Sequence, residues 1–155
     1  MAVRKIQHGD LASVLALMQR HAHLENYDDI FAVDEQALSR LGLDRAPPTC
    51  NIVVSENSEG KIVGFALYLI LEFTFRNRPV LYLNDLLVDE AHRRRGIARE
   101  LMAALCREAE TLGCFRIKWG VSSANTEALV FYESIGAIRE KGKFYYTLDE
   151  GAFRR

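Results

Sequence analysis

A short basic loop holds the residues of this sequence that are best suited to chemistry. It reads Asp89-Glu90-Ala91-His92-Arg93-Arg94-Arg95-Gly96-Ile97-Ala98-Arg99. A helix that starts at about Arg95 has main-chain N–H groups without partners inside the helix, and its dipole favours an anion there. Guanidinium groups can fork onto phosphate oxygens, and small side chains let a phosphate approach the main chain. The predicted phosphate-binding residues are Arg93, Arg94, Arg95, Gly96, Ile97, Ala98 and Arg99.

Two other interpretations of the loop are a solvated basic corner and a patch for nucleic acid. The position of the loop favours phosphate, because it joins a predicted strand to the start of a predicted helix. The Gly-x-x-x-x-Gly-Lys-Ser/Thr motif is absent, and only one glycine is present, so neither a nucleotide P-loop nor a dinucleotide fingerprint is indicated.

The strand before the loop, residues 80–89, breaks its own alternation. Leu81 and Leu83 share one parity, and Leu86 and Val88 share the other. A one-residue bulge near Asn84 and Asp85 would place all four leucine and valine side chains on one face. A strand buried on both faces is the other interpretation.

The elements around this strand predict a mixed α/β sheet with helices on both faces. One strand-helix-strand unit, residues 80–121, needs a right-handed crossover, which brings the loop to the carboxyl end of its first strand. No linker divides the chain, so a single domain over 1–155 is expected. The predicted elements are a strand at 3–7, a helix capped by Asp10, a helix at 35–43, strands at 51–56, 61–75 and 80–89, a helix at 95–113, a strand at 116–123, a helix from Asn125 or Thr126 to Gly136, and terminal strands near 137–139 and at 143–148.

Composition narrows the possible partners. The chain has 155 residues and a net charge of −1, so nothing global attracts it to nucleic acid or to an acidic membrane. Three cysteines lack metal-ligand spacing and fit a reducing compartment, and His21 and His23 do not share a helix face. We therefore expect a cytoplasmic protein without a metal, a membrane partner or a nucleic-acid partner.

The stretch Arg93–Ala98 resembles the Arg/Gln-x-x-Gly-x-Gly/Ala signature of the GNAT superfamily of acetyl-CoA-dependent N-acetyltransferases. The resemblance extends over essentially the whole chain, through Tyr82–Val88, Asn125 and Phe131–Ala137. Within the superfamily the chain is most similar to the spermidine/spermine (diamine) and thialysine acetyltransferases, on the phrases 62–68 and 81–85.

The resemblance implies a central, mostly antiparallel sheet whose splayed strands hold acetyl-CoA. The pantetheine arm would pair with main-chain groups of Leu86, Leu87 and Val88, and a backbone N–H near Leu87 or Val88 would stabilise the oxyanion. Asn125 would contact the arm and also cap a helix. Tyr132 would be the general acid, although a core tyrosine is the simpler interpretation of its position.

The resemblance also locates the acceptor amine. Polyamine acetyltransferases carry a glutamate where this chain has Asn84, which cannot act as a base; Asp85 is the remaining candidate, with Glu72 or a water chain as substitutes. The predicted acceptor-binding residues are Glu25, Tyr27, Asp28 and Asn84, although a solvated loop explains the acidic connector equally well.

The expected activity is transfer of an acetyl group from acetyl-CoA to a primary amine of a small molecule by direct attack in a ternary complex. A protein N-terminus or lysine as acceptor, and a non-catalytic acyl-CoA-binding regulatory module, are the alternatives. The diamine-type relatives imply a homodimer.

Overall fold

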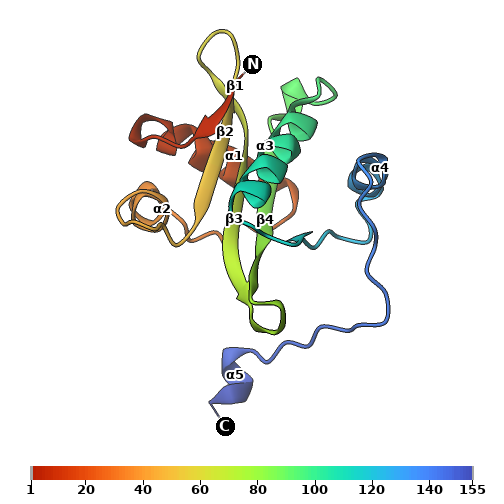
Figure 1. The fold of residues 1–155 in the computed structure, drawn as a ribbon. Coiled ribbons are helices and arrows are strands. Elements are labelled where there is room, and N and C mark those ends of the chain that lie inside the picture. The colour runs from red at the N-terminus through yellow and green to blue at the C-terminus, as the bar shows by residue number, and fades with distance from the viewer. Residues whose placement is uncertain (1, 155) are drawn as a thin grey trace. The chain divides into compact units, whose positions relative to one another are not determined.

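The computed structural model of the protein describes residues 2–154. It separates into two compact units, of which one ends at Gly120 and the other begins at Val121. The first unit contains a five-stranded sheet with the order β1-β2-β3-β4-β5 (Figure 1). Neighbouring strands of this sheet are antiparallel, except for the parallel pair β4–β5. The strands are β1 (Ala2–Lys5), β2 (Asn51–Glu56), β3 (Ile62–Phe73), β4 (Arg78–Val88) and β5 (Ile117–Lys118).

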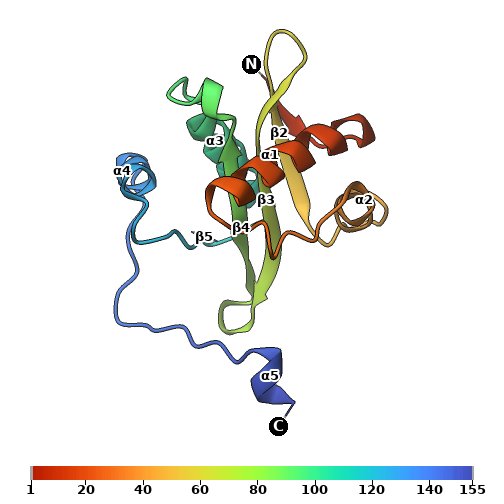
Figure 2. The ribbon, with the colours of Figure 1, turned by 180° about the vertical axis from the view of Figure 1, so that it is seen from behind.

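Helices cover both faces of this sheet. Helix α1 (Leu11–Leu24) lies in front of the sheet in Figure 2, and α3 (Ile97–Thr111) lies behind it. Helix α2 (Glu35–Gly42) shares a buried apolar cluster with α1, β2 and β3. Short 3-10 turns occupy His8–Asp10, Thr74–Arg76 and Glu90–His92. The predicted mixed α/β class, mostly antiparallel with helices on both faces, is confirmed.

The predicted bulge in β4 is confirmed by the register of β3 and β4. Leu67 pairs with Asp85 and Tyr68 pairs with Leu83, so Asn84 is the extra residue. Leu81, Leu83, Leu86 and Val88 consequently pair with Ile70, Tyr68, Ala66 and Gly64, which alternate along one face of β3. Helix α3 packs on that face of the sheet, because a Cβ built on Gly64 would meet side chains of α3. Asp85 and Leu87 therefore point to the α1 face.

The bulge also determines which main-chain groups of β4 face its second edge. The Leu81 N–H donates to the Arg116 carbonyl on the β5 side, whereas the Asp89 N–H donates to the Val63 carbonyl on the β3 side. In an antiparallel ladder these directions alternate, so the N–H and C=O groups of Leu86 and Val88 point toward the β5 side. The β4–β5 pairing, however, covers only Leu81 and Tyr82. The edge at Leu86 and Val88 lies beyond it.

The second unit contains α4 (Thr126–Ser134) and α5 (Glu150–Phe153). The Asn125 side chain accepts a hydrogen bond from the Ala128 N–H at 3.1 Å, so its predicted role as a helix cap is confirmed. Gly136, in the left-handed region at φ 89°, follows the end of α4 as predicted. Within residues 2–154, no helix is both long and apolar enough to span a bilayer.

Several sequence predictions about local structure are wrong. Asp10 occupies the N-cap position of α1 as predicted, but its side chain makes no capping hydrogen bond. Its carboxylate instead accepts hydrogen bonds from Arg4, at 2.7 and 3.1 Å, and from the Gln7 N–H. The predicted strand at 116–123 shortens to β5, and the helix at 95–113 to α3. Residues 137–139 and 143–148 form no strand. A high β propensity is not sufficient, because a strand also needs a neighbouring strand to pair with.

Gly64 of β3 is expected to be essential for the close approach of this strand to β4 and α3. A Cβ at this position would lie 3.0 Å from the Leu87 carbonyl oxygen and 3.2 Å from the Ile97 side chain. We expect Gly64→Ala to lower the free energy of unfolding by about 1–3 kcal/mol, the usual cost of overpacking. Urea denaturation measures this value. Gly9→Ala is the control, since nothing lies within 4 Å of its added methyl group, and equal effects of the two variants would contradict the prediction.

Candidate active site

The predicted phosphate loop leads from β4 into α3 through two left-handed residues. Arg94 has φ 63° and Gly96 has φ 81°, and Gly96 is the residue that precedes the helix. The Glu100 N–H donates to the Gly96 carbonyl at 3.0 Å, so the N–H groups of residues 97–99 lie ahead of the helical ladder. A Cβ on Gly96 would meet nothing within 4 Å. The loop therefore presents main-chain N–H groups next to open space, with exposed arginines at 93, 94, 95 and 99.

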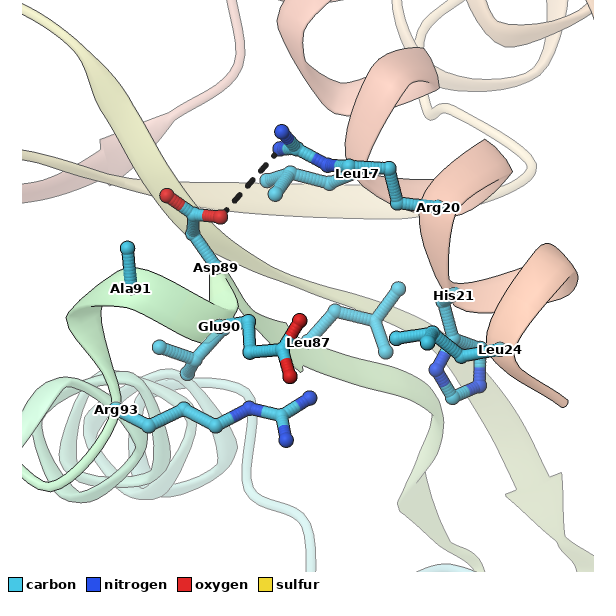
Figure 3. A pocket seen from close by; sticks show the side chains of 10 residues that line it. Leu17, Arg20, His21, Leu24, Leu87, Asp89, Glu90, Ala91 and Arg93 are labelled. Carbon is cyan, nitrogen blue, oxygen red and sulfur yellow. Dashed lines mark ion pairs between the residues drawn. The ribbon is translucent and has the colours of Figure 1, made fainter.

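Asp89 fixes the beginning of this loop. Its side chain is only 9% exposed, and one carboxylate oxygen lies 2.9 Å from Nδ1 of His92. Arg20 of α1 approaches the carboxylate at 3.6 Å and Lys61 approaches it at 3.7 Å, and Figure 3 shows the Arg20 pair. Burial alone would raise the pKa of Asp89, but the His92 hydrogen bond and the charges of Arg20 and Lys61 outweigh it and lower the pKa. Asp89 thus joins the loop to α1 and to the start of β3.

We expect Asp89→Asn to lower the free energy of unfolding at pH 7 by about 1–2 kcal/mol, because it removes the charge from a buried hydrogen-bonded acceptor. The folded pKa of Asp89 lies below the unfolded value. Its stabilisation is therefore present above the unfolded pKa of about 4 and lost as the pH falls through the folded pKa. Urea denaturation at pH 7 and pH 3 tests this. The difference in the free energy of unfolding between wild type and variant should shrink at pH 3. A difference that stays constant would contradict the lowered pKa of Asp89. Glu59→Gln, at an exposed hairpin tip, is the control.

Two cavities meet along β4 on its α1 face. The first, of about 390 Å³, lies between α1 and the loop, where Glu90 and Arg93 extend toward it opposite His21 and Leu24 (Figure 3). The second, of about 350 Å³, lies between α1, the connector that follows it and β4. His21 and Leu87 line both cavities. The described lining of the second cavity consists of Met18, His21, Ala22, Tyr27, Ile30, Phe31, Ala32, Val33, Asp85 and Leu87.

The structure separates the predicted acceptor-binding residues. Tyr27 and Asp85 line the second cavity, and Asn84 donates a hydrogen bond from its side-chain amide to the Asp85 carboxylate at 3.0 Å. Glu25 and Asp28 are not among the described residues that line it. Asp28 instead lies 3.3 Å from Nδ1 of His23. Glu72, the substitute base, is exposed near the end of β3 and belongs to neither cavity.

Asn125 and Tyr132 belong to the second unit. Tyr132 lies in α4, and its ring is 5.4 Å from the ring of Phe131. Burial raises the pKa of Tyr132 above the ordinary value for a phenol. The phenol therefore carries its proton at neutral pH and is able to act as an acid.

The sequence alone did not identify Asp89, Arg20, His21 or Phe31 as residues that line or fix the two cavities. The signal for Asp89 was available: an acidic residue at the end of an apolar strand, directly before the basic loop. The positions of Arg20 and His21, which follow Leu17 at helical spacing, likewise placed them on the face of α1 that turns toward the sheet. Phe31 offered no such signal, because the connector has no periodicity.

Comparison with known proteins supports the mixed α/β fold described above. Residues 15–137 match the Acetyltransferase (GNAT) family. Among solved structures, an integron cassette protein from the mobile metagenome of V. cholerae superposes with a TM-score of 0.80 at 24% identity, covering 99% of this chain and 94% of that one. An aminoglycoside acetyltransferase from an uncultured soil metagenomic sample superposes with a TM-score of 0.77 at 25% identity, covering 96% of each chain.

Curated relatives are similar at a low level of identity. An L-ornithine N5-acetyltransferase from Arabidopsis thaliana is 33% identical over 49% of this chain, and the match spans 33% of that protein's length. A glucosamine 6-phosphate N-acetyltransferase from Trypanosoma brucei brucei is 26% identical over 88% of each chain. A spermidine/spermine N(1)-acetyltransferase-like protein from Homo sapiens is 29% identical over 88% of this chain and 20% of its own length. With the family match over most of its length, this chain belongs to the GNAT family of acetyltransferases.

Proposed function

We propose that the protein transfers an acetyl group from acetyl-CoA to a primary amine of a small molecule, by direct attack within a ternary complex. The observation that carries this proposal is the Asn84 bulge. It turns the main-chain groups of Leu86 and Val88 toward an edge beyond the β4–β5 pairing, and this edge leads to the arginine loop. The names of the relatives described above give an amino acid, an amino sugar phosphate, a polyamine and an aminoglycoside as acceptors, and these support a small amine.

The residues of the first unit fit acetyl-CoA at both of its polar regions. The N–H groups ahead of α3, the open space at Gly96 and the arginines at 93–95 and 99 suit a pyrophosphate. The main-chain groups of Leu86 and Val88 suit the amides of a pantetheine arm, as in the addition of a strand to a sheet edge. Those of Leu87, by the same alternation, point to β3. Leu86 and Val88 are therefore the proposed main-chain partners, with Val88 as the proposed oxyanion donor.

The remaining residues handle the amine and the proton. Acetyl-CoA, when bound, supplies an activated thioester. Asp85 faces the second cavity, the proposed acceptor cavity, and the Asn84 amide orients its carboxylate. Asp85 is the proposed partner of the ammonium and the proposed base, which takes the proton from the nitrogen before the neutral amine attacks the thioester. Tyr132 is the proposed general acid for the leaving thiolate, and its raised pKa keeps the proton on the phenol oxygen. Asn125, at the start of the same helix, is proposed to contact the cofactor arm.

Release of free thiol from acetyl-CoA on mixing with a panel of amines tests this function. The panel includes amino acids, amino sugars, alkylamines, polyamines and a peptide with a free N-terminus. We expect release with small amines only. Acetylation of the peptide alone would indicate that the acceptor is a protein. Tight binding of acetyl-CoA without release of free thiol in the presence of any of the amines would indicate a regulatory module.

Two further parts of the proposal concern the whole protein. We propose that it works as a homodimer in the cytoplasm, which three cysteines without a disulfide and the similarity to diamine acetyltransferases support. Light scattering at micromolar concentration tests the dimer, and a mass of one chain would contradict it.

A further inference from the structure

The chemistry of the acceptor cavity says more about the amine than the family does. Within the part of the chain that the structure describes, Asp85 is the one carboxylate among its lining residues. The other lining side chains are apolar except for His21 and Tyr27. The cavity therefore offers one strong partner for a cation, surrounded by surface that favours hydrocarbon.

The acidic connector does not change this picture, because its carboxylates have other positions. Asp34 caps α2 by accepting a hydrogen bond from the Ala37 N–H at 2.8 Å, and Asp28 pairs with His23. Asp29 is exposed and is not among the lining residues. The connector instead contributes Tyr27, Ile30 and Phe31, which a turn brings together: the Ile30 N–H donates to the Tyr27 carbonyl at 3.0 Å.

From this arrangement we infer that the preferred acceptor is a monoamine with an apolar body, such as an alkylamine or arylalkylamine, rather than a diamine, polyamine or polycationic sugar. The inference rests on the proposed function and names the substrate class of the same site. One ammonium pairs with Asp85, and the hydrocarbon part lies against Ile30, Phe31 and Val33.

A second ammonium on the acceptor would lie beside these partly exposed side chains with no carboxylate of the cavity lining to pair with. Loss of part of its water shell without an ion-pair partner opposes binding, and the rings of Tyr27 and Phe31 offer a cation less than a carboxylate does. A site also discriminates most strongly when the wrong substrate leaves a buried polar group without a partner. Selection against a second charge is therefore expected to be stronger than selection among hydrocarbon lengths.

A matched pair of amines tests the inference. Hexylamine and 1,6-diaminohexane have the same carbon chain and differ by one ammonium group. With saturating acetyl-CoA, we expect kcat/KM for hexylamine to exceed that for 1,6-diaminohexane by about tenfold or more. Asp85→Asn should lower kcat/KM for both amines by about tenfold or more, because it removes the partner of the shared ammonium. Asp29→Asn removes a nearby carboxylate outside the cavity and should leave both values unchanged.

A gain of function tests the same idea without damaging the site. Ala32 lines the cavity and is exposed, so Ala32→Asp adds a second carboxylate at little cost in folding. It should shift the ratio of the two kcat/KM values toward the diamine by about tenfold, whereas the matched Ala32→Asn should not.

The outcomes separate the inference from the proposed function. A wild-type preference for 1,6-diaminohexane or for spermidine overturns the inference and leaves the acetyltransferase function intact. Binding of acetyl-CoA in calorimetry without turnover of hexylamine overturns the inference as well. Failure to bind acetyl-CoA at all overturns the proposed function itself.

Discussion

Replacing Tyr132 with phenylalanine is expected to lower kcat by about 100- to 10,000-fold, the usual contribution of general-acid assistance. The substitution removes one hydroxyl and keeps the ring, so the contact with Phe131 remains. The affinity for acetyl-CoA, measured by calorimetry, should change little. If Tyr132 only packs, the loss should instead be about 1 kcal/mol of stability from one hydrogen bond, with kcat nearly normal.

Measurement of kcat and melting temperature on the same variant separates the two roles of Tyr132. Tyr146→Phe is the control, since it removes the same group from an exposed tyrosine in the same unit. The pH profile gives a second readout. A general acid must keep its proton, so its contribution is lost as the pH rises through its pKa. Burial raises the pKa of Tyr132, which places that loss at a higher pH than for an exposed tyrosine.

The bulge at Asn84 shows what a sequence pattern predicts well. The parity of the apolar residues changes within one strand, and side-chain direction in a strand has a period of two. A single inserted residue is the simplest way to keep Leu81 and Val88 on one face, and the register of β3 and β4 contains it. The turn into α3 was predictable for a similar reason, because local residue types such as Gly96 determine where a helix starts.

Contacts between distant segments were not predictable in the same way. Asp89 acquires its role from Arg20 in α1 and from Lys61 at the β2–β3 hairpin, and neither is near it in sequence. The side-chain positions in the connector after α1 were likewise not evident from its sequence. Its charges dominate its composition, whereas its turn places aromatic and aliphatic side chains in the cavity.

The terminal aromatic segment shows the limit of local propensity. Phe144, Tyr145 and Tyr146 are typical strand residues, but strand formation depends on a partner edge and on packing. The structure has no strand at 143–148. This segment therefore offers no strand edge that could pair with a second copy of the chain, and the proposed homodimer rests on the similarity to relatives alone.

The second large effect is expected at Gly96, where a negative side chain would stand beside the proposed pyrophosphate site. Gly96→Glu should weaken acetyl-CoA binding by about 100-fold or more. Gly96 lies at φ 81°, a conformation that disfavours any side chain by about 1–2 kcal/mol. If the loop shifts to relieve this strain, the affinity for acetyl-CoA should fall by about tenfold. Repulsion between the added carboxylate and a phosphate contributes at least about another tenfold at a partly screened surface.

A series of variants at Gly96 distinguishes backbone strain from charge. Gly96→Gln has the shape of the glutamate without its charge, and Gly96→Asn suits the left-handed backbone better than most residues. The dissociation constant of acetyl-CoA, measured by calorimetry, should rise from wild type through Asn and Gln to Glu. The gap between Gln and Glu should narrow as salt increases, because ions screen an exposed charge pair, whereas the gap between Gly and Gln should not. Wild-type affinity in a correctly folded Gly96→Glu variant would show that the anion binds elsewhere, and the arginines of the loop would then be only a solvated corner of the protein.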